Sequence, residues 1–380
     1  MNLELSEEQK LLQKSVREFA ESEVRPLAKE LDETGHFPRE LFKKAAELGL
    51  TGVAFPEAEG GAGFDHLAYT IVIEEISRCC ASTGVILSVQ NSLFCDPIHR
   101  YGTGEQKRKF LLPFTRGERI GCYALTEPQA GSNAAALQTK AVKQGDTYVI
   151  NGTKAWITNG GVADAAIVYV NTDPAKGERG ITAIVVEKGA PGFKVGKEEK
   201  KMGINATACC ELIFTDCAVP VANRVGNEGE GYKVALSTLD GGRIGIAAQA
   251  TGIAQGAFEA ALKWAQERMA FGHPIAQFQA IQFMLADMAT EIDAARLLVR
   301  KAAWKQDSGG RFSQEAATAK LFASEMATRV THKAIQIHGG YGYSREYPVE
   351  RAYRDARITE IYEGTSEIQR LVIASWVLKG

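Results

Sequence analysis

The chain has 380 residues, of which 45% are hydrophobic and 24% are charged, and its formal net charge is −2. These values are typical of a globular protein with a sizeable core. The near-neutral charge argues against a nucleic-acid-binding protein, which would carry a basic excess. No apolar run approaches the ~20 residues needed to cross a bilayer. We therefore expect neither a nucleic-acid partner nor insertion into a membrane.

The N-terminal segment and the cysteines bear on the location of the protein. MNLELSEEQK lacks the basic flank and apolar stretch of a secretion signal. The seven cysteines include two adjacent pairs and no regular framework, as in proteins whose thiols stay reduced. We expect a cytoplasmic protein, or one of the mitochondrial matrix if the source is eukaryotic. The six histidines show no metal-ligand spacing, so no metal site is expected.

Residues 1–120 are predicted to be mainly helical. Ser6 and Gln9 have the spacing of a capping box at the start of a helix, and apolar residues then recur on one helical face. The glycine-rich stretch 59–64 follows no strand and lacks the spacing of a dinucleotide fingerprint, so we interpret it as a loop.

Residues 121–225 are rich in short extended segments. DAAIVYV, GITAIVVE and CCELIFTDCAVP are bounded by Gly, Pro or Asp, and Gly145–Asp146 and Asn151–Gly152 are predicted turns. This composition predicts a small antiparallel sandwich or barrel in the middle of the chain.

Residues 226–380 return to a helical periodicity. Apolar residues from Ile281 to Ala302 recur three and four positions apart, which predicts a long helix with one buried seam. Gly252 and Gly256 lie one turn apart on another predicted helix and would allow a close helix crossing. We expect a helical bundle here, and hence a mainly α protein with a central β domain.

Several stretches combine groups that suit a ligand, although each also has an ordinary structural explanation. YALTEPQAGSN (123–133) offers hydroxyls beside a glycine, or is a connecting loop. WIT (156–158) is a binding element, or places a Trp in the packing of a sheet. Arg268 and Phe271, where a helix is expected to end at Gly272, suit a phosphate and an adenine ring, or are a surface arginine beside a core aromatic.

Two further stretches are equally open when taken alone. Arg243 follows two glycines in LDGGRIG and is either a phosphate ligand or a solvated charge. QIHGGYGYSREYP (336–348) is a glycine-rich turn that could simply end a helix.

In this order, the stretches together resemble the acyl-CoA dehydrogenase family, FAD enzymes that desaturate acyl-CoA thioesters. The resemblance runs from Leu5 to the final helix and includes YALTEPQAGSNA, NGTKAWITN, TLDGGRIGIAAQA, ERMAFGHPI, QIHGGYGY and RDARITEIYEGTSEIQRL. It is closest to the short-chain, butyryl-CoA-type members. It implies an N-terminal α-helical domain (1–120), a middle antiparallel β domain (121–225) and a C-terminal four-helix bundle (226–380).

The resemblance implies an FAD site that is shared between two subunits of a homotetramer, a dimer of dimers. The positions that match flavin and pyrophosphate contacts are Tyr123, Ala124, Leu125, Thr126, Gly131, Ser132, Trp156, Ile157, Thr158, Thr365 and Glu367. Thr158 would donate toward flavin N5. The positions that match contacts to the adenine half, across the subunit boundary, are Arg268, Phe271, Gln279, Gln336, Gly339 and Gly340.

Glu363, in IYEGTSEIQR, matches the catalytic base of the family. It would remove the α-proton while flavin N5 takes the β-hydride, which gives the trans-2-enoyl-CoA, and electrons would pass to an electron-transfer flavoprotein. A free carboxylate with a pKa near ~4.3 is a poor base for this step, so burial is expected to raise that pKa. In the local sequence, Ser366 and Gln369 predict the cap of the last helix.

The resemblance also implies contacts to the acyl-CoA substrate. The matching positions are Ser132, Asp240, Arg243 and Gly364, and Tyr362 would supply an aromatic wall. Asn133 stands where the family usually has Asp, which removes a charge near the CoA channel. Asp96 is either a second carboxylate near the acyl end or a capping or surface residue before Pro97.

The position of Gly242 separates subgroups of the family. Members that act on isovaleryl or long-chain substrates carry their base in the segment that matches LDGGR, just before the arginine. This chain has Gly242 there, so the resemblance assigns the base to Glu363 and favours a straight-chain substrate.

The alternative within the same fold is a dehydrogenase for a cyclic, aromatic or dicarboxylic acyl-CoA. An oxidase is less favoured, because oxidases of the family usually carry a further helical domain. A nucleic-acid-associated member would need a basic face. A catalytically dead scaffold would tend to lose the base, which is present here.

Overall fold

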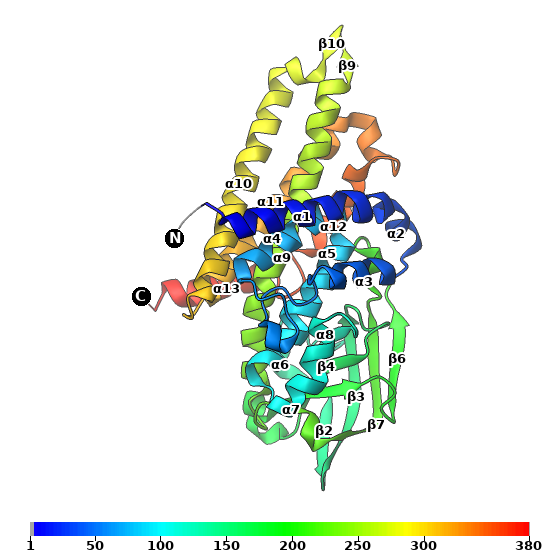
Figure 1. Cartoon of the computed structure of the whole chain (residues 1–380), viewed down its shortest axis with the longest axis vertical. Coiled ribbons are helices and arrows are strands. Elements are labelled where there is room, and N and C mark those ends of the chain that lie inside the picture. The colour runs from blue at the N-terminus through cyan, green and yellow to red at the C-terminus, as the bar shows by residue number, and fades with distance from the viewer. Residues whose placement is uncertain (1–3, 380) are drawn as a thin grey trace.

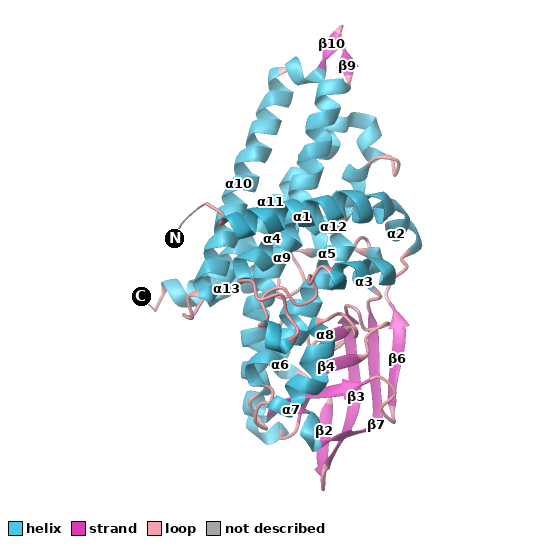
Figure 2. Cartoon of the chain, in the orientation of Figure 1, coloured by secondary structure: helices cyan, strands magenta, loops and turns pink. Residues whose placement is uncertain are grey.

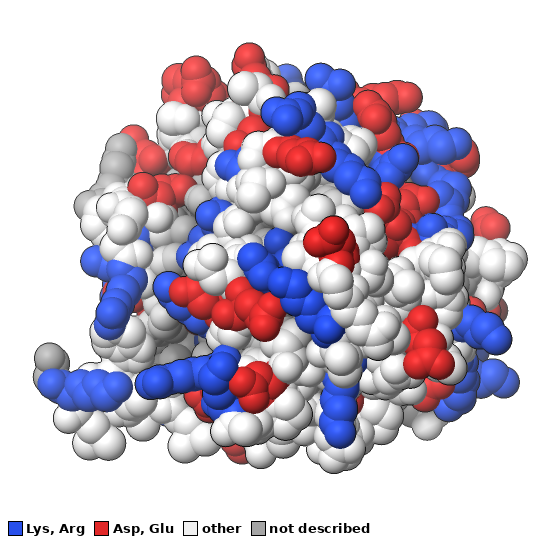
Figure 3. All heavy atoms as spheres, turned by 90° about the horizontal axis from the view of Figure 1, so that it is seen from below, with Lys and Arg blue, Asp and Glu red and all other residues white. Residues whose placement is uncertain are grey.

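The computed structural model describes residues 4–379, and its helices lie at both ends of the chain with a β-sheet between them (Figure 1; Figure 2). This confirms the expected mainly α protein with a central β domain. Among residues 4–379, no helix is both long and apolar enough to span a membrane. On the face seen in Figure 3, lysines and arginines are interspersed with acidic residues.

The first part of the chain consists of short helices, of which α1 and α5 pack against α4. Their bounds are α1 (Glu7–Phe19), α2 (Ala28–Thr34), α3 (Arg39–Glu47), α4 (His66–Cys79), α5 (Ala81–Ser88), α6 (Asp96–Tyr101), α7 (Gly104–Gln106) and α8 (Leu112–Thr115). The predicted capping box is confirmed, since Ser6 Oγ accepts the Gln9 N–H at 3.1 Å and Gln9 Oε1 accepts the Ser6 N–H at 3.0 Å. A π-helical turn, η4 (Val89–Cys95), joins α5 to α6. Such turns are frequent at functional sites.

The middle part is an eight-stranded sheet. Its strands are β1 (Gly121–Ala124), β2 (Lys140–Gln144), β3 (Thr147–Ile157), β4 (Ala165–Asn171), β5 (Ile181–Glu187), β6 (Phe193–Glu198), β7 (Cys210–Pro220) and β8 (Arg224–Val225). The order is β6-β7-β3-β2-β4-β5-β8, and β1 pairs with β4. Most pairs are antiparallel as expected, but β1 lies parallel to β4, and β2 has one parallel bridge to β4.

One of the two predicted turns in the middle part is wrong. Gly145–Asp146 does connect β2 to β3, whereas Asn151–Gly152 lies inside β3 at a register shift against β7. A Cβ atom built on Gly152 would stand 2.5 Å from Thr139 Oγ1. The glycine is therefore required by a close approach at a bulge rather than by a hairpin turn.

The last part contains three long helices. Its elements are α9 (Gly231–Glu267), the hairpin β9 (Met269–Ala270) and β10 (His273–Pro274), α10 (Gln279–Asp307), α11 (Ser313–His338), α12 (Pro348–Ile358) and α13 (Ser366–Val377). Helix α9 packs against α4, α10 and α11, and its first turns also contact β5. The hairpin stands at the far end of α9 and α10, away from the sheet (Figure 1).

The predicted helix crossing and the predicted seam are both present. A Cβ atom on Gly252 would lie 2.3 Å from the carbonyl oxygen of Glu74, and one on Gly256 would lie 2.2 Å from that of Arg78. These two glycines therefore let α9 cross α4 at backbone contact. On α10, the seam residues Met288, Ile292, Ala295, Val299 and Ala302 are buried.

Candidate active site

Glu363 lies in the turn between α12 and α13. Its φ is 53° and that of Gly364 is 97°, so two consecutive residues adopt left-handed conformations. Such a conformation costs a non-glycine residue ~1–3 kcal/mol and persists where the surrounding structure imposes it. The turn therefore fixes the direction in which the Glu363 side chain leaves the backbone.

The predicted cap of α13 is wrong. Thr365, with φ −60° and ψ 165°, is the N-cap, and its Oγ1 accepts the N–H of Ile368 at 3.4 Å. The extended position that follows the left-handed turn falls on Thr365, which leaves Ser366 as the first helical residue. The side chain of Gln369 instead turns back, and its Nε2 donates to the carbonyl oxygens of Gly364 at 2.8 Å and Glu363 at 3.3 Å.

The carboxylate of Glu363 lies against α9 at Gly242. A Cβ atom built on Gly242 would stand 2.2 Å from Oε2 of Glu363 and 2.8 Å from Cδ2 of Leu93, which belongs to the π-helical turn η4. Oε2 is buried and has no hydrogen-bond partner among residues 4–379. A buried carboxylate oxygen without a partner is costly. A carboxylate oxygen in this state is more typical of a ligand-binding site than of a structural contact.

Burial determines the acidity of Glu363. It raises the pKa of this carboxyl to about 7, although the positive charges of Lys320 and Arg243 act in the opposite direction. A carboxylate with a pKa near neutrality is a stronger base than a free one, and a large fraction of it is still ionised at neutral pH.

Lys320 was not predicted from the sequence as a site residue, but the fold places it against the Glu363–Gly364 turn. Lys320 lies on α11 with no exposed surface, and its Nζ donates to the carbonyl oxygen of Gly364 at 2.7 Å. The stretch EAATAKLFASEMA carried a signal, because Lys320 falls between Ala316 and Ala323 on the buried face of the helix. A charged residue inside an apolar stripe is uncommon and calls for a partner.

The hydroxyl of Tyr362 is fixed by the buried side chain of Gln249, which was not predicted from the sequence as a site residue. This hydroxyl donates to Oε1 of Gln249, and Nε2 of Gln249 donates to the carbonyl oxygen of Ala81 at 3.0 Å. Gln249 has no exposed surface and lies on α9. The ring of Tyr362 packs against the main hydrophobic core.

The predicted flavin residues of the middle part come together where β1 and β3 end. The N–H of Ala155 donates to the carbonyl oxygen of Thr126 at 2.9 Å and joins the two segments. Ala124, Leu125 and Ile157 are buried there. Tyr123, Thr126 and Thr158 are half-buried, and Gly131 and Ser132 are exposed.

A buried ion pair next to these residues was also not predicted from the sequence. Nζ of Lys154 donates to Oε1 of Glu127 at 2.7 Å and to the carbonyl oxygen of Leu125 at 3.0 Å. Glu127 also accepts the backbone N–H groups of Gln138 and Thr139. Both side chains are 1% exposed or less. The pair ties the loop after β1 to the interior of β3.

Trp156 has an unusual backbone and an exposed ring. Its φ is 61° and its exposed fraction is 58%. Of the seven non-glycine residues with positive φ among residues 4–379, three are predicted site residues, namely Trp156, Phe271 and Glu363. A Cβ atom on Gly131 would meet nothing within 4 Å. An exposed ring, half-buried hydroxyls and an open glycine suit a flat, hydrogen-bonding ring system, so these residues fit a flavin.

The predicted adenine-half residues lie at the other end of α9. Helix α9 ends at Glu267, five residues before the predicted end at Gly272, because the chain enters the hairpin β9–β10 there. Arg268 lies over the rings of Trp264, at 5.9 Å, and Tyr341, at 5.3 Å. The remaining members, all exposed, are Phe271, Gln279, Gln336, Gly339 and Gly340.

The two groups of predicted FAD residues are far apart within one chain. Arg243, whose Nε lies 3.5 Å from the carbonyl oxygen of Glu363, and Arg268 are 25 positions apart along α9. At a rise of 1.5 Å per residue this corresponds to about 37 Å along the helix. Arg268 therefore lies far along α9 from the Glu363 turn.

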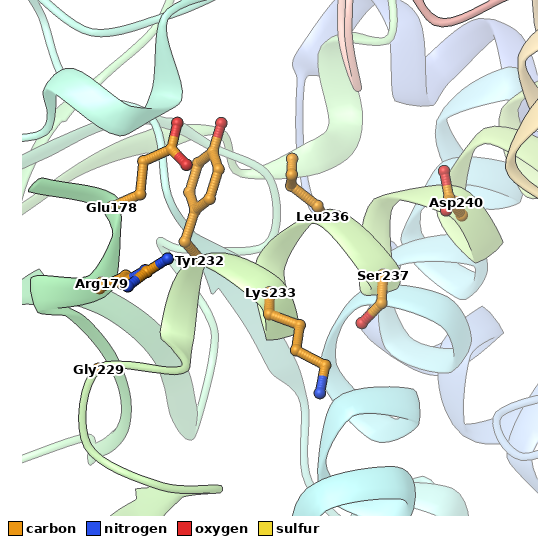
Figure 4. A pocket seen from close by; sticks show the side chains of 8 residues that line it. All are labelled: Glu178, Arg179, Gly229, Tyr232, Lys233, Leu236, Ser237 and Asp240. Atoms are coloured by element: carbon orange, nitrogen blue, oxygen red, sulfur yellow. The ribbon is translucent and has the colours of Figure 1, made fainter. Parts of the chain in front are cut away.

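A cavity of about 500 Å³ opens beside the first turns of α9 (Figure 4). Its lining residues are Glu178, Arg179, Gly229, Tyr232, Lys233, Leu236, Ser237 and Asp240. Most of them lie on one face of α9, and the row ends at Asp240. The cavity thus leads along the helix toward Arg243, which contacts the Glu363 turn.

Asp240 and Arg243 form an ion pair on α9. Nη1 of Arg243 donates to Oδ1 of Asp240 at 2.7 Å, and Oγ of Ser313 donates to Oδ2 at 2.5 Å. Arg243 is 5% exposed. The reading of Arg243 as a solvated charge is therefore wrong, because the packing of α9 against the Glu363 turn buries it.

The structure also shows the surroundings of Asp96 and Asn133, two residues that the sequence pointed to. Asp96 is a buried residue at the start of α6, where its Oδ2 lies 3.4 Å from Nη1 of Arg100. Cys95 holds the N-cap position, so Asp96 does not cap the helix. Asn133 is exposed, and its carbonyl oxygen accepts the N–H of Ala136.

Models of the three acyl-CoA dehydrogenase domains match successive parts of the chain. The N-terminal domain model matches residues 6–118, the middle domain model residues 122–217 and the C-terminal domain model residues 229–378.

Individual relatives agree with this match. The chain is 52% identical over 379 residues to the short-chain specific acyl-CoA dehydrogenase of Clostridium acetobutylicum, which covers 100% of both chains. Butyryl-CoA dehydrogenase from Megasphaera elsdenii superposes with a TM-score of 0.98 at 47% identity, and covers 100% of both chains. A chain in the structure described as "Electron transferring flavoprotein of Acidaminococcus fermentans: Towards a mechanism of flavin-based electron bifurcation" gives a TM-score of 0.99 at 49% identity, again over 100% of both chains. The protein belongs to the acyl-CoA dehydrogenase family and is an FAD-dependent enzyme of that family.

Proposed function

We propose that Glu363 is the base with which this acyl-CoA dehydrogenase removes the α-proton of a short-chain acyl-CoA. The observation that carries the proposal is the buried Oε2 atom of Glu363, which has no partner among residues 4–379 and lies against the backbone of Gly242. A thioester whose α-carbon comes near this atom would find a basic oxygen with no competing hydrogen bond.

The acidity of Glu363 fits this role. The α-proton of a thioester is weakly acidic, so proton transfer needs a base with a pKa well above that of a free carboxyl. Burial supplies this, since it raises the pKa of Glu363 to about 7. A bound acyl chain would exclude more water and raise that pKa further. Bound FAD supplies the hydride acceptor, so proton and hydride leave neighbouring carbons and an α,β-double bond forms.

The residues at the ends of β1 and β3 would hold the flavin. The hydroxyls of Thr126 and Thr158 are half-buried and can donate to ring atoms, and the exposed ring of Trp156 can pack against the isoalloxazine. Thr365, the cap of α13, lies two residues from the base and would approach the flavin from the other side. The ion pair of Lys154 and Glu127 would keep the loop in place.

The adenine half would be held by a second copy of the chain. Arg243 and Arg268, which directly follows α9, are 25 positions apart, or about 37 Å at a rise of 1.5 Å per residue, and this separation supports a site shared by two subunits. Three large apolar side chains at the hairpin end are exposed in the single chain, Met269 by 55%, Phe271 by 92% and Phe283 by 65%. Exposed apolar surface of this kind marks interfaces. We propose a homotetramer arranged as a dimer of dimers.

The polar part of the substrate would occupy the cavity beside α9. Arg179 and Lys233 carry positive charge for phosphate groups, and Asp240 stands at the end nearest Arg243 and the base. The volume of this cavity, about 500 Å³, suits an elongated pantetheine chain with its nucleotide.

The substrate class and the electron acceptor are supported by the relatives. The Clostridium acetobutylicum protein, at 52% identity, is short-chain specific, and the Megasphaera elsdenii structure is a butyryl-CoA dehydrogenase. A nearly identical fold occurs in the Acidaminococcus fermentans structure, which concerns an electron transferring flavoprotein. We therefore propose a straight short-chain acyl-CoA as substrate, an electron-transfer flavoprotein as acceptor and a cytoplasmic location.

Two measurements test this function. In anaerobic mixing, butyryl-CoA should bleach the wild-type flavin, whereas Glu363→Gln should keep its FAD and bind butyryl-CoA but bleach at least ~10³-fold more slowly, as expected when a base is lost. Wild-type bleaching by this variant would contradict the assignment of the base. Comparing butyryl, hexanoyl, octanoyl, isobutyryl, glutaryl and cyclohexyl thioesters then tests the substrate class. A preference for a cyclic or dicarboxylic thioester would replace the short-chain assignment.

A further inference from the structure

The amino group of a buried lysine contacts the turn that carries the proposed base. Lys320 has no exposed surface, and its Nζ lies 2.7 Å from the carbonyl oxygen of Gly364. Moving an ammonium group out of water costs several kcal/mol unless it is well paired. A methionine of similar length would fill the same space without that cost. Packing alone therefore does not account for a lysine at this position.

The Glu363–Gly364 turn is held by donors from three helices. Lys320 on α11 and Gln369 on α13 both donate to the carbonyl oxygen of Gly364, at 2.7 Å and 2.8 Å. The carbonyl oxygen of Glu363 receives Nε2 of Gln369 at 3.3 Å and Nε of Arg243 at 3.5 Å. All three donor residues are 5% exposed or less. These contacts give a physical reason why two consecutive left-handed residues persist.

Lys320 differs from the other two donors in its charge and in its partner. Gln369 is neutral, and Arg243 is charged but is already paired with the carboxylate of Asp240 at 2.7 Å. Lys320 donates to an uncharged carbonyl group, so its charge acts on the carboxylate of Glu363. This attraction favours the ionised form of the base, in opposition to burial.

We propose that Lys320 is the positioning residue of the base, which holds the Gly364 carbonyl so that the Glu363 carboxylate stays packed against Gly242, and which stabilises that carboxylate in its ionised form. This inference rests on the assignment of Glu363 as the base.

Among the other ionisable groups of residues 4–379 that face the pair, Arg243 also favours the ionised form of Glu363, but by less than Lys320 does. The ionisable residues that face Glu363, besides Lys320, are Arg243 on α9, Tyr69 on α4, Tyr123 on β1 and the neighbouring Tyr362. The three tyrosines are buried with pKa values raised above their usual range, so they remain neutral. Lys320 itself faces Glu363, Arg243, Glu360 and Glu367, and burial lowers its pKa to about 7 while the three carboxylates oppose this.

The test compares two substitutions of Lys320 in the FAD-loaded enzyme. Lys320→Met removes the donor and the charge, and Lys320→Gln keeps a donor for the Gly364 carbonyl without the charge. We expect Lys320→Met to slow anaerobic flavin reduction by butyryl-CoA at least ~10-fold, because a misplaced base loses its alignment. The midpoint of the pH profile should move to higher pH, because the ionised carboxylate has lost a neighbouring cation. Lys320→Gln should recover part of the rate but keep the shifted midpoint.

A matched control lies one turn away on the same helix. Oγ of Ser324 donates to the carbonyl oxygen of Thr359 at 2.8 Å, which ties α11 to the segment before the base without any charge. Ser324→Ala should lower the melting temperature and leave the pH midpoint unchanged. Binding of an unreactive thioether analogue of butyryl-CoA, measured by calorimetry, should change less than twofold in Lys320→Gln, since this lysine does not contact substrate.

The outcomes are decisive in both directions. Wild-type rate and midpoint in Lys320→Met would overturn the proposal, and so would an equal midpoint shift in Ser324→Ala. If Lys320→Met does not retain FAD, the midpoint of Lys320→Gln decides. Failure of the proposed function would appear differently, as wild-type bleaching by Glu363→Gln. An inactive Glu363→Gln beside unaffected Lys320 variants would overturn only the role of the lysine.

Discussion

Gly242 on α9 and Glu363 in the turn before α13 compete for one space, since a Cβ atom on Gly242 would stand 2.2 Å from Oε2 of Glu363. Real atoms do not approach so closely, so a side chain at position 242 and the present position of the carboxylate exclude each other. The position of the base is therefore coupled to the absence of a side chain on the facing helix.

Gly242→Ala should reduce activity by displacing the carboxylate. The new methyl group would overlap Oε2 of Glu363 at 2.2 Å and stand 2.8 Å from Leu93 Cδ2, so the carboxylate has to move by about 1 Å to reach ordinary contact at 3.4 Å. A displacement of ~1 Å from productive geometry can cost ~10²-fold in rate. Anaerobic flavin reduction by butyryl-CoA should therefore slow by ~10- to 100-fold while FAD content stays at the wild-type level.

The neighbouring glycine provides the control. A Cβ atom on Gly241 meets only Nε2 of Gln306, at 3.7 Å, which is ordinary contact. Gly241→Ala should stabilise α9 by ~0.5–1 kcal/mol, because alanine loses less backbone entropy in a helix. If Gly241→Ala slowed flavin reduction as much as Gly242→Ala does, the effect would belong to the helix and not to the carboxylate.

The pH dependence should follow the protonation of Glu363. The base acts in its ionised form, and burial raises its pKa to about 7. The value of kcat/KM for butyryl-CoA should therefore rise with pH through about 7 and fall tenfold per unit well below it. Initial rates between pH 5 and pH 9, with FAD content checked at each pH, measure this. A midpoint near ~4.3 would show a base in contact with water.

Lys154→Met should destabilise the middle of the molecule. Removing one partner of a buried ion pair leaves Glu127 charged and unpaired, which costs ~3–5 kcal/mol. Because Lys154 also holds the carbonyl oxygen of Leu125 at 3.0 Å, the variant should lose FAD more readily. Thermal unfolding and dialysis against FAD-free buffer measure the two effects.

The control for that change is an exposed lysine of the same sheet. Lys143→Met on β2 should stay within ~0.5 kcal/mol of the wild type, as is usual for surface substitutions. Adding Glu127→Gln to Lys154→Met should restore part of the stability, because it removes the unpaired charge. No recovery in the double variant would mean that packing, and not charge, explains the loss.

Phe271→Glu should weaken assembly. Phe271 is 92% exposed in the single chain at the tip of the hairpin β9–β10, where we place the shared FAD site. A charge in an apolar interface is costly, so sedimentation should show smaller species and a lower FAD content. Val142→Glu, at a valine that is 59% exposed on β2, should leave both unchanged. A tetramer with full FAD in Phe271→Glu would place the interface elsewhere.

The sequence by itself determined the order of the parts, the cap at Ser6, the buried seam of α10 and the helix crossing at Gly252 and Gly256. These features depend on neighbours a few positions apart, where periodicity and glycine spacing are informative. It also pointed to Glu363 through the resemblance of IYEGTSEIQR to a family.

Only the tertiary structure decided what surrounds Glu363. Gly242, Lys320 and Gln369 meet the turn from three helices, and no local pattern shows that Gln369 binds carbonyl groups instead of capping α13. The same reason explains the errors at Asn151–Gly152 and at the end of α9, where a close strand contact and a hairpin overrode local propensity. The raised pKa of Glu363 has this origin too, because burial by distant segments produces it.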